Sequence, residues 1–230
     1  MTYQFDFSFL QQYWPDLLRG VWLTIRMTLL ATVPGFVLGV ALAVGRLHGN
    51  KPLSAAIRSY IEVIRNTPLV LQVFWIFFGL AAIRMHVPAL EAAVVALIVN
   101  VSAYTAEIMR AGLESIHDSQ VEAASCLAMS RTQVLWYIEI PQAVEKMYPA
   151  LVSQFMLMLL ATSIMSQISA DELTGVADLI QSITFRGFEA YAVIAVIYLV
   201  LASGLRVLLL SAGSLLFPRL RTTLATGGRA

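Results

Sequence analysis

Long apolar runs constrain this chain more than any other feature of its sequence. Four of them, at residues 21–44, 89–109, 143–168 and 190–216, are each long enough to cross a lipid bilayer as a helix, which takes about 20 residues. Only 13% of the residues are charged and 59% are hydrophobic, whereas a soluble domain carries about 25% charged residues. The sequence therefore predicts an all-α integral membrane protein.

A shorter apolar run at residues 67–83 is marginal as a membrane span on its own. The amphipathic stretch before it, residues 53–64, could lengthen it on the cytoplasmic side. Counting this run gives five transmembrane helices. We therefore expect an N-terminal periplasmic segment at 1–16, a transmembrane domain at 17–216 and a cytoplasmic tail at 217–230.

Lysine and arginine are distributed unevenly between the loops, and cytoplasmic loops carry an excess of both. Three segments are basic, through Arg46, Lys51, Arg58 and Arg65, through Arg110, Arg131 and Lys146, and through Arg219, Arg221 and Arg229. Segment 169–189, by contrast, holds Asp171, Glu172, Asp178 and Glu189 with Arg186 as its only basic residue. We therefore expect the N-terminus outside, the C-terminus in the cytoplasm and a cytoplasmic loop at 117–140.

Small residues recur every four positions in the first span, at Ala31, Gly35, Gly39 and Ala43. Such a stripe lets the backbone of a second helix approach closely. Chance is an equally good explanation in a span that tolerates alanine and glycine.

Sequence motifs for the common catalytic and ligand sites are missing. The chain has no GxxxxGK[ST] loop for ATP, no HExxH or CxxC metal motif and no GxSxG turn. Its three histidines lie in separate loops, and its net charge is +1 without a basic block, so we expect no nucleic-acid partner. We expect no catalytic residue, no metal and no cofactor bound by this chain.

The loop at 117–140 carries two helix-start signals. Ser119 and Glu122 are spaced as a capping box, in which the hydroxyl and the carboxylate each satisfy a free backbone amide. Ser130 and Gln133 form a second box. We expect two short helices, separated by a turn near Ala128.

Pro141 sets the expected end of the second short helix. Proline disfavours helical geometry in the residue before it, so this helix should stop near Ile140. Pro141 can then open the next span, because its missing N–H is tolerated in a first turn.

Apolar residues in this loop exceed what a solvated connection needs: Val121, Leu127, Met129, Val134, Leu135 and Trp136. An apolar surface facing water usually has a partner. An ordinary helical loop is the alternative.

The stretch EAASCLAMSRTQVLWYIEIP resembles the EAA signature of bacterial ABC importer permeases, in which EAA is followed by a glycine and then by I-x-L-P. Glu122, Ala123, Ala124, Ile138 and Pro141 match this signature. The chain departs from it at Ala128, where the family has glycine, and at Ile140, where leucine is usual. Alanine in the left-handed turn that glycine supplies costs roughly 1 kcal/mol. We therefore expect either that the first short helix runs on slightly or that the turn is made differently.

Further stretches are similar to the polar amino-acid uptake branch of that family, among them YIEVIRNTPLVLQVFWIFFGL and AYTAEIMRAGLESI. The resemblance implies a type I ABC importer permease fold with five spans, and a transport subunit rather than an enzyme. The chain departs at Leu160, where members often carry a lysine before the Thr-Ser pair of the fourth span.

Partners follow from the same resemblance. They are a dimeric ABC ATPase that binds ATP and magnesium, a second permease subunit that is identical or related, a periplasmic amino-acid binding protein and the lipid of the bacterial inner membrane. The missing lysine at Leu160 slightly favours unequal permease halves.

The loop would then couple the ATPase to the spans. Glu122, Ala123 and Ala124 are the contact positions that the resemblance implies. From the residues themselves, Arg131 could supply a charge at the rim of the contact and Trp136 a large anchor. A solvated loop charge is the alternative for Arg131.

Polar side chains within spans are costly and tend to mark transport pathways. Our candidates are Gln72 in the second span, Asn100, Ser102, Tyr104 and Glu107 in the third, and Gln154, Thr162, Ser163 and Gln167 in the fourth, the last four expected largely on one side. Glu107 and Arg110 could instead simply neutralise one another. Arg65 is read as an interfacial anchor or phosphate contact, with a solute contact as the alternative.

Two other classes of protein remain to be weighed. A secondary transporter or channel would show inverted repeats and broken helices, and we find no such signature in the sequence. An intramembrane enzyme would need a catalytic constellation at membrane depth, and none stands out.

Overall fold

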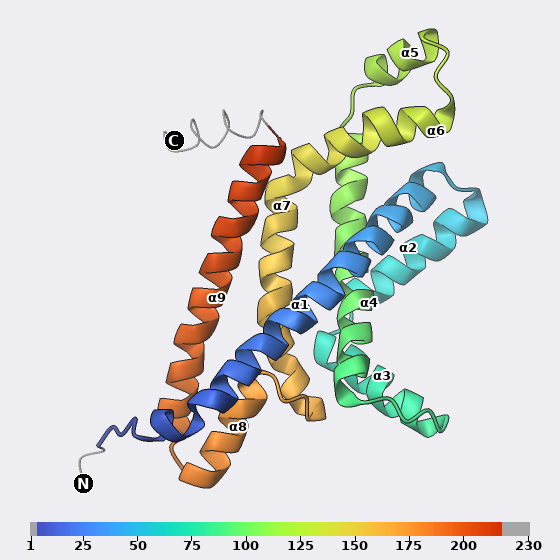
Figure 1. Cartoon of the computed structure of the whole chain (residues 1–230). Helices are drawn as coiled ribbons and strands as arrows, with labels where there is room; N and C mark the ends of the chain where they lie inside the picture. The colour runs from blue at the N-terminus through green and yellow to red at the C-terminus, as the bar shows by residue number, and fades with distance from the viewer. Residues whose placement is uncertain (1–3, 218–230) are drawn as a thin grey trace.

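The computed structural model describes residues 4–217, and within this range the secondary structure is entirely helical (Figure 1). In chain order the elements are α1 (Phe9–His48), α2 (Lys51–Arg65), α3 (Leu69–Ala82), α4 (Ala89–Glu114), α5 (Asp118–Cys126), α6 (Arg131–Val134), a π turn (Leu135–Glu139), α7 (Ile140–Ala161), a 3-10 turn (Thr162–Ile168), α8 (Leu173–Thr184) and α9 (Gly187–Leu216). Helix α1 begins within the expected N-terminal segment and runs on without interruption. The expected basic tail lies outside the described residues, apart from Phe217.

Membrane-spanning helices match the expected runs. Four helical segments are long and apolar enough to cross a bilayer, namely Phe9–His48, Ala89–Glu114, Arg131–Ile168 and Gly187–Leu216. The pair α2 and α3 passes the same test as one broken span. The prediction of five spans in an all-α membrane protein is confirmed.

The small-residue stripe of α1 packs directly against α4. A Cβ atom added at Gly35 would lie 2.0 Å from Cγ1 of Val101, and one added at Gly39 would lie 2.6 Å from Cβ of Thr105. Ala31 is fully buried in the same row. The interpretation of the stripe as a close-approach surface is confirmed, and it explains why α1 and α4 form the most extensive helix pair of the bundle.

The second span is broken rather than straight. The helix axis bends by 106° between α2 and α3, across residues 66–68. The bend arises because Pro68 has no N–H to continue the helix and pushes the residue before it out of helical geometry. Asn66 and Thr67 side chains bond the carbonyls of Glu62 and Val63, which satisfies groups that the break leaves free. The sequence search for broken-helix signatures missed this one.

The coupling loop and the fourth span also differ from expectation. The second short helix does not end near Ile140; it continues through the π turn into α7, so that Arg131–Ile168 forms one long helical segment. Pro141 thus lies inside a continuous helix, where it has no N–H to donate and its ring would clash with the carbonyl four residues earlier. That carbonyl belongs to Tyr137, within the wider π turn Leu135–Glu139, which accommodates the proline. Figure 1 shows α6 bending into α7 as one ribbon.

The basic loops and the acidic segment lie at opposite ends of the molecule. In Figure 1 the N-terminal end of α1, the C-terminal end of α3 and α8 lie at one end of the molecule, and the α1–α2 turn, α5 and α6 lie at the other. The basic loop residues Arg46, Lys51, Arg110 and Arg131 belong to the second end. Helix α8, with its acidic flanks, covers the first end and packs against α1 and α9.

Candidate functional site

A cavity of about 540 Å³ lies where the broken span meets α4 and α7. Its lining comes from three directions: Arg65, Asn66, Thr67, Pro68 and Leu69 at the break, Asn100 and Tyr104 on α4, and Gln154, Leu157, Met158 and Ala161 on α7. Asn100 lies near the middle of the 26-residue α4, so the cavity sits at the depth of the bundle's centre. Irregular backbone is tolerated at that depth only where it is buried in protein or lines a water-filled cavity.

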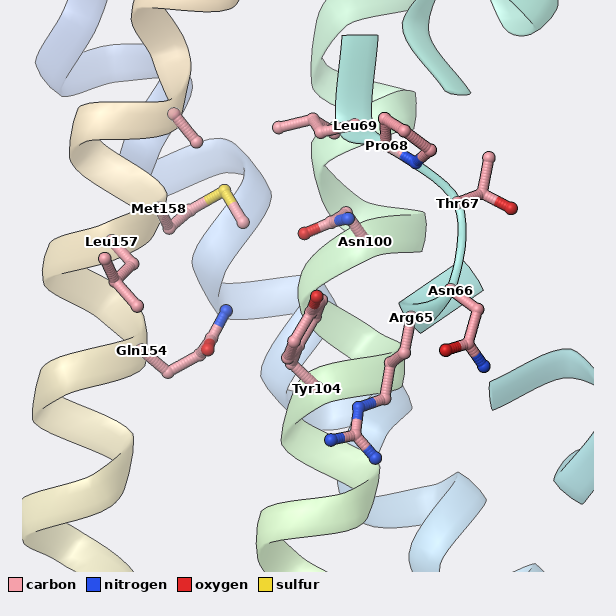
Figure 2. Close-up of a pocket in the computed structure, with 11 residues that line it drawn as sticks. Arg65, Asn66, Thr67, Pro68, Leu69, Asn100, Tyr104, Gln154, Leu157 and Met158 are labelled. Carbon is pink, nitrogen blue, oxygen red and sulfur yellow. The ribbon is translucent and has the colours of Figure 1, made fainter. Parts of the chain in front are cut away.

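Two amides position the break against α4. The Nε2 group of Gln72 donates to the carbonyls of Ile64 and Thr67, at 2.8 Å each. Its Oε1 accepts from Nδ2 of Asn100 at 3.1 Å. Gln72 therefore holds the unwound segment in place and is no lining residue, whereas Asn100 keeps its Oδ1 toward the cavity and α7 (Figure 2).

The remaining polar groups of the cavity are less committed. The guanidinium of Arg65 lies 5.4 Å from the ring centre of Tyr104, a distance suited to a cation–π contact. Gln154 is only 9% exposed, and its amide projects from α7 into the space opposite Tyr104 (Figure 2). Among the described residues its amide has no hydrogen-bond partner. The cavity thus presents the Arg65 cation, the Gln154 amide, the Oδ1 of Asn100 and the Tyr104 phenol.

Glu107 lies beside the cavity and is paired with arginines. Arg46 approaches its carboxylate at 2.7 Å, Arg110 contacts it through both Nε and Nη2, and Arg65 lies at 3.9 Å. Arg110 also contacts Glu114. The geometry favours the pairing of Glu107 with Arg110 that the spacing suggested, extended to Arg46.

Four other candidate pathway residues lie away from the cavity lining. Ser102 is fully buried and hydrogen-bonded to Tyr60. Thr162 is also fully buried and donates to the Leu159 carbonyl. Ser163 bonds the Leu160 carbonyl, and Gln167 is exposed. The expectation that the polar residues of the fourth span share one side is wrong, because the helix tightens to 3-10 geometry from Thr162 onward.

The turn between α5 and α6 is left-handed at Ala128, with φ of 58°. The N–H of Met129 bonds the carbonyl of Ala124, and the N–H of Ala128 bonds that of Ser125. This is the Schellman pattern, which usually places glycine where Ala128 stands. The expectation that the first short helix runs on or that the turn is made differently is wrong: Ala128 itself makes the left-handed turn that the signature's glycine would make.

One of the two predicted capping boxes exists. Ser130 caps α6, and Gln133 returns the hydrogen bond to the Ser130 amide. The box at Ser119 is wrong: the N-cap residue of α5 is His117, two residues before the predicted one, and the helix begins at Asp118. The Ser119 hydroxyl therefore lies inside the first turn. It bonds Nδ1 of His117 instead, at 3.0 Å.

The loop offers a mixed surface at the end of the molecule. Glu122 and Ala123 are exposed, while Ala124 packs inward with 3% exposure. The segment from α5 through the π turn also exposes large apolar groups: Leu127, Trp136 and Tyr137. Helix α5 protrudes beyond the ends of the long helices in Figure 1. An exposed apolar surface of this kind is typical of a docking site.

A charged cluster ties the loop to the end of α1. Nε2 of His48 lies 3.2 Å from the buried carboxylate of Glu139, and Nδ1 of His48 lies 3.1 Å from Arg131. Arg131 also approaches Glu139, at 3.9 Å. Arg131 is therefore partly committed to structure rather than a free rim charge. These three residues border a second cavity, of about 380 Å³, between the loop and the ends of α1 and α4.

Sequence and structure comparisons agree on the family. The sequence profile of the family described as "Binding-protein-dependent transport system inner membrane component" matches residues 35–222. This chain belongs to that family.

Individual relatives cover most of this permease. The probable glutamine ABC transporter permease protein GlnM of Bacillus subtilis is 37% identical over 182 residues, which are 79% of this chain and 84% of the relative. The octopine transport system permease protein OccM of Rhizobium radiobacter is 36% identical over 206 residues, 86% of this chain and 84% of the relative. A crystal structure of an amino acid ABC transporter with histidines matches with a TM-score of 0.82 and 40% identity, covering 90% of this chain and 97% of the other.

The fold prediction is thus confirmed as that of an ABC importer permease. The chain is a transport subunit of the inner membrane and not an enzyme, and systems of this family work with a binding protein and a separate ATPase. Within residues 4–217 no group of histidine, cysteine, aspartate and glutamate side chains is arranged to hold a metal ion.

Sequence reasoning missed two features of this permease. The break at residues 66–68 makes Arg65 a lining residue of the cavity, and Pro68 after two polar residues was the signal that could have shown it. The tie between His48 and Glu139 joins residues far apart in the sequence. No local pattern announces such a pair.

Proposed function

We propose that this permease carries polar amino acids across the inner membrane by alternating access, driven by an ATPase that docks on the loop of α5 and α6. The amino-acid part of this proposal is supported by the relatives, whose names refer to glutamine and octopine. The single observation that carries the docking part is the protruding loop (Figure 1), whose α5 exposes Glu122 and Ala123 and whose π turn exposes Trp136.

The loop is built to transmit force. Helix α6 continues through the π turn into α7 without an unstructured joint. A push on α5 and α6 therefore reaches α7, which lines the cavity through Gln154, Leu157 and Met158. Nucleotide binding can shift the permease between two states only if the ATPase binds this loop better in one of them.

The cavity at the break is the proposed solute pathway. It lies at mid-bundle, exposes the unpartnered amide of Gln154 and has the size of sites that hold small molecules. Of the predicted pathway residues, Asn100, Tyr104 and Gln154 belong to it, and Gln72 supports it. Ser102, Thr162, Ser163, Gln167 and Glu107 serve packing or ion pairing in this proposal.

A second permease subunit would complete the pathway, because the cavity is open on one side and five spans are too few to enclose a channel. We favour a related rather than an identical partner, on the ground of Leu160. In the proposed orientation the N-terminus and α8 face the periplasm, where a binding protein would deliver solute, and the loop and the C-terminus face the cytoplasm. The positively charged loops at the α5–α6 end support this orientation.

Reversing the charge at Glu122 tests the docking surface. We expect Glu122→Lys to reduce solute uptake and co-purification of the ATPase by at least about tenfold, because one misplaced charge at a buried contact costs 2 kcal/mol or more, on the order of the values for charged pairs at interfaces. The insertion of the permease should be unchanged. Co-purification and uptake of the purified complex are the measurements.

Glu62→Lys is the matched control, since Glu62 is an exposed glutamate of α2 outside the loop whose partner is the exposed Arg58. It should leave both measurements near wild type, because exposed pairs contribute little. Full uptake and full assembly of the Glu122→Lys variant would contradict the proposed docking surface.

A further inference from the structure

We infer that the cavity at the broken span binds the carboxylate of its solute at Arg65 and accepts neutral or acidic amino acids in preference to cationic ones. This inference rests on the proposed function and narrows its class of solute. It is argued from the charges that line the cavity, from the helix that begins there and from the amide that faces it.

The lining of the cavity contains a single charged side chain, that of Arg65; the other lining groups are amides, hydroxyls, apolar side chains and a proline. Glu107, whose carboxylate lies 3.9 Å from Arg65, does not belong to the lining and is also bonded to Arg46 and Arg110. Around Glu107 and Glu114 three guanidinium groups face two carboxylates. The field at this side of the cavity is therefore positive.

Helix α3 begins at the cavity and adds to this field. Leu69, its first residue, is part of the lining. The first N–H groups of a helix have no acceptor within the helix, and the helix dipole favours an anion at this end. In α3 the earliest amides with a partner are those of Leu71 and Gln72, both bonded to the Pro68 carbonyl. A discontinuous helix of this kind suits an anionic group of a transported solute.

Gln154 provides an independent sign that the cavity holds a ligand. Its side chain is nine-tenths buried, faces the cavity and has no hydrogen-bond partner among the described residues (Figure 2). Its amide atoms open into the cavity, where a polar group of a solute can bond them. With the Oδ1 of Asn100 pointing the same way, the site offers amide oxygens to an ammonium or amide group of the solute.

These groups discriminate by charge. A solute carboxylate at Arg65 makes charge-assisted hydrogen bonds, and its α-amino group finds the amide oxygens of Asn100 and Gln154. A second cation on the side chain would find no carboxylate in the lining and would lie in a positive field. Rejection by an uncompensated charge is a common source of specificity.

Solute binding to the assembled complex tests the inference. The permease complex, with its ATPase and without the binding protein, is reconstituted in nanodiscs, and equilibrium dialysis measures the affinities for L-glutamine, L-serine, L-glutamate, L-lysine and L-arginine. We expect the tightest ligand to be a neutral or acidic amino acid. Its α-amide, which lacks the carboxylate, and both cationic amino acids should bind at least about tenfold more weakly, in line with the loss of one charge-assisted hydrogen bond.

Variants at Arg65 assign the effect to its guanidinium. Arg65→Gln should weaken binding of the tightest amino acid by about tenfold or more, and Arg65→Lys by less, because it keeps the charge but loses the two-pronged geometry. Arg58→Gln is the matched control, because Arg58 is on the same helix, exposed and outside the cavity. The affinity of this variant for the tightest amino acid should equal that of wild type. The lysine variant guards against a folding defect in the glutamine variant.

Tightest binding of L-lysine or L-arginine, or unchanged affinity in Arg65→Gln, would overturn the inference while leaving amino-acid transport as the function. If no amino acid binds and none is taken up by the complete system, the proposed function fails and the inference fails with it.

Discussion

Ala128 adopts a left-handed backbone conformation that glycine usually provides. Its φ of 58° places an alanine where helix ends usually have glycine. The hydrogen bonds of Ala128 and Met129 to the end of α5 hold the turn in place. The strain is small, about 1 kcal/mol, so the turn survives the substitution.

We predict that Ala128→Gly stabilises the end of α5 by about 0.5–1 kcal/mol, because glycine adopts positive φ without a Cβ clash. Amide hydrogen exchange at Met129, whose N–H bonds Ala124, should slow by several-fold. Ala123→Gly, in the regular part of α5, should instead speed exchange, since glycine weakens a helix interior. Faster exchange at Met129 in Ala128→Gly would show that the turn is not strained.

Glu172 is the fully buried carboxyl group at the start of α8. It accepts hydrogen bonds from the amides of Thr174 and Gly175 and, at 2.6 Å, from the Tyr198 hydroxyl. Burial raises the pKa of Glu172 above its usual range, and these hydrogen bonds offset the rise only in part. The side chain thus joins α8 to α9 in a proton-dependent way.

A raised pKa has a defined sign for stability. The folded protein holds the Glu172 proton more tightly than the unfolded chain, so this contribution is complete below about pH 4.5 and is lost as the pH rises through the raised pKa. We predict that the melting temperature of wild type falls relative to that of Glu172→Gln as the pH rises from about 4.5 toward neutrality, because the glutamine carries no proton to lose. Melting curves of the detergent-purified permease measure the difference. Parallel curves would show that Glu172 keeps its usual pKa.

At the scale of elements, close packing of α1 on α4 sets the frame on which the other helices are arranged. Gly35 and Gly39 bring the two backbones together, and a Cβ at Gly39 would lie 2.9 Å from the backbone oxygen of Ser102. Backbone cannot move aside as a side chain can. The same α4 carries Asn100 and Tyr104 of the cavity, so the packing of α1 positions one wall of the solute site.

We predict that Gly39→Ala lowers the free energy of unfolding by about 1–3 kcal/mol, the usual cost of overpacking a tight contact. Gly79→Ala is the control: nothing lies within 4 Å of its added Cβ, and alanine favours the helix. Thermal melting of the purified variants should place Gly39→Ala below wild type and Gly79→Ala at or slightly above it. Equal melting temperatures for the two variants would show that α1 and α4 are not closely packed at this point.

Helix α6 and the π turn connect the α5–α6 loop to the bundle. They give the loop a continuous helical path into α7, and the His48–Glu139 pair ties that path to the end of α1. The loop is therefore joined to α7 through the continuous helix and to α1 through this pair. A load on α5 would reach both α7 and α1.

At the scale of the whole molecule, the spans could be predicted from the sequence because a membrane helix is recognisable by the length of its apolar run. The spans around Ala31 and Asn100 could be located without tertiary information. The spacing of the small residues in α1 was enough to predict which face of that helix packs closely. What the sequence did not show depends on backbone detail and on distant contacts. The break before Pro68, the π turn before Pro141 and the tightened helix at Thr162 all change which residues share a face.

The candidate sites follow the same division. The surface around Glu122 lies on a short local helix, so the sequence could place it. The cavity combines Arg65, Tyr104 and Gln154 from three helices, and only two of these were named as pathway residues in advance. Thr162 was expected in the pathway and is instead fully buried, since its position depends on the 3-10 turn rather than on regular helical spacing.

We thus interpret the complete permease as a helical bundle in which a separate ATPase, docked on the loop of α5 and α6, drives the opening and closing of the cavity. Amino-acid uptake into proteoliposomes tests this most directly, with the permease pair and binding protein present and the ATPase complete, absent or unable to hydrolyse ATP. The ATP-driven mechanism predicts uptake only with the active ATPase and with ATP on the side that exposes α5 and α6. Uptake at an equal rate without the ATPase, driven by an ion gradient, would contradict it.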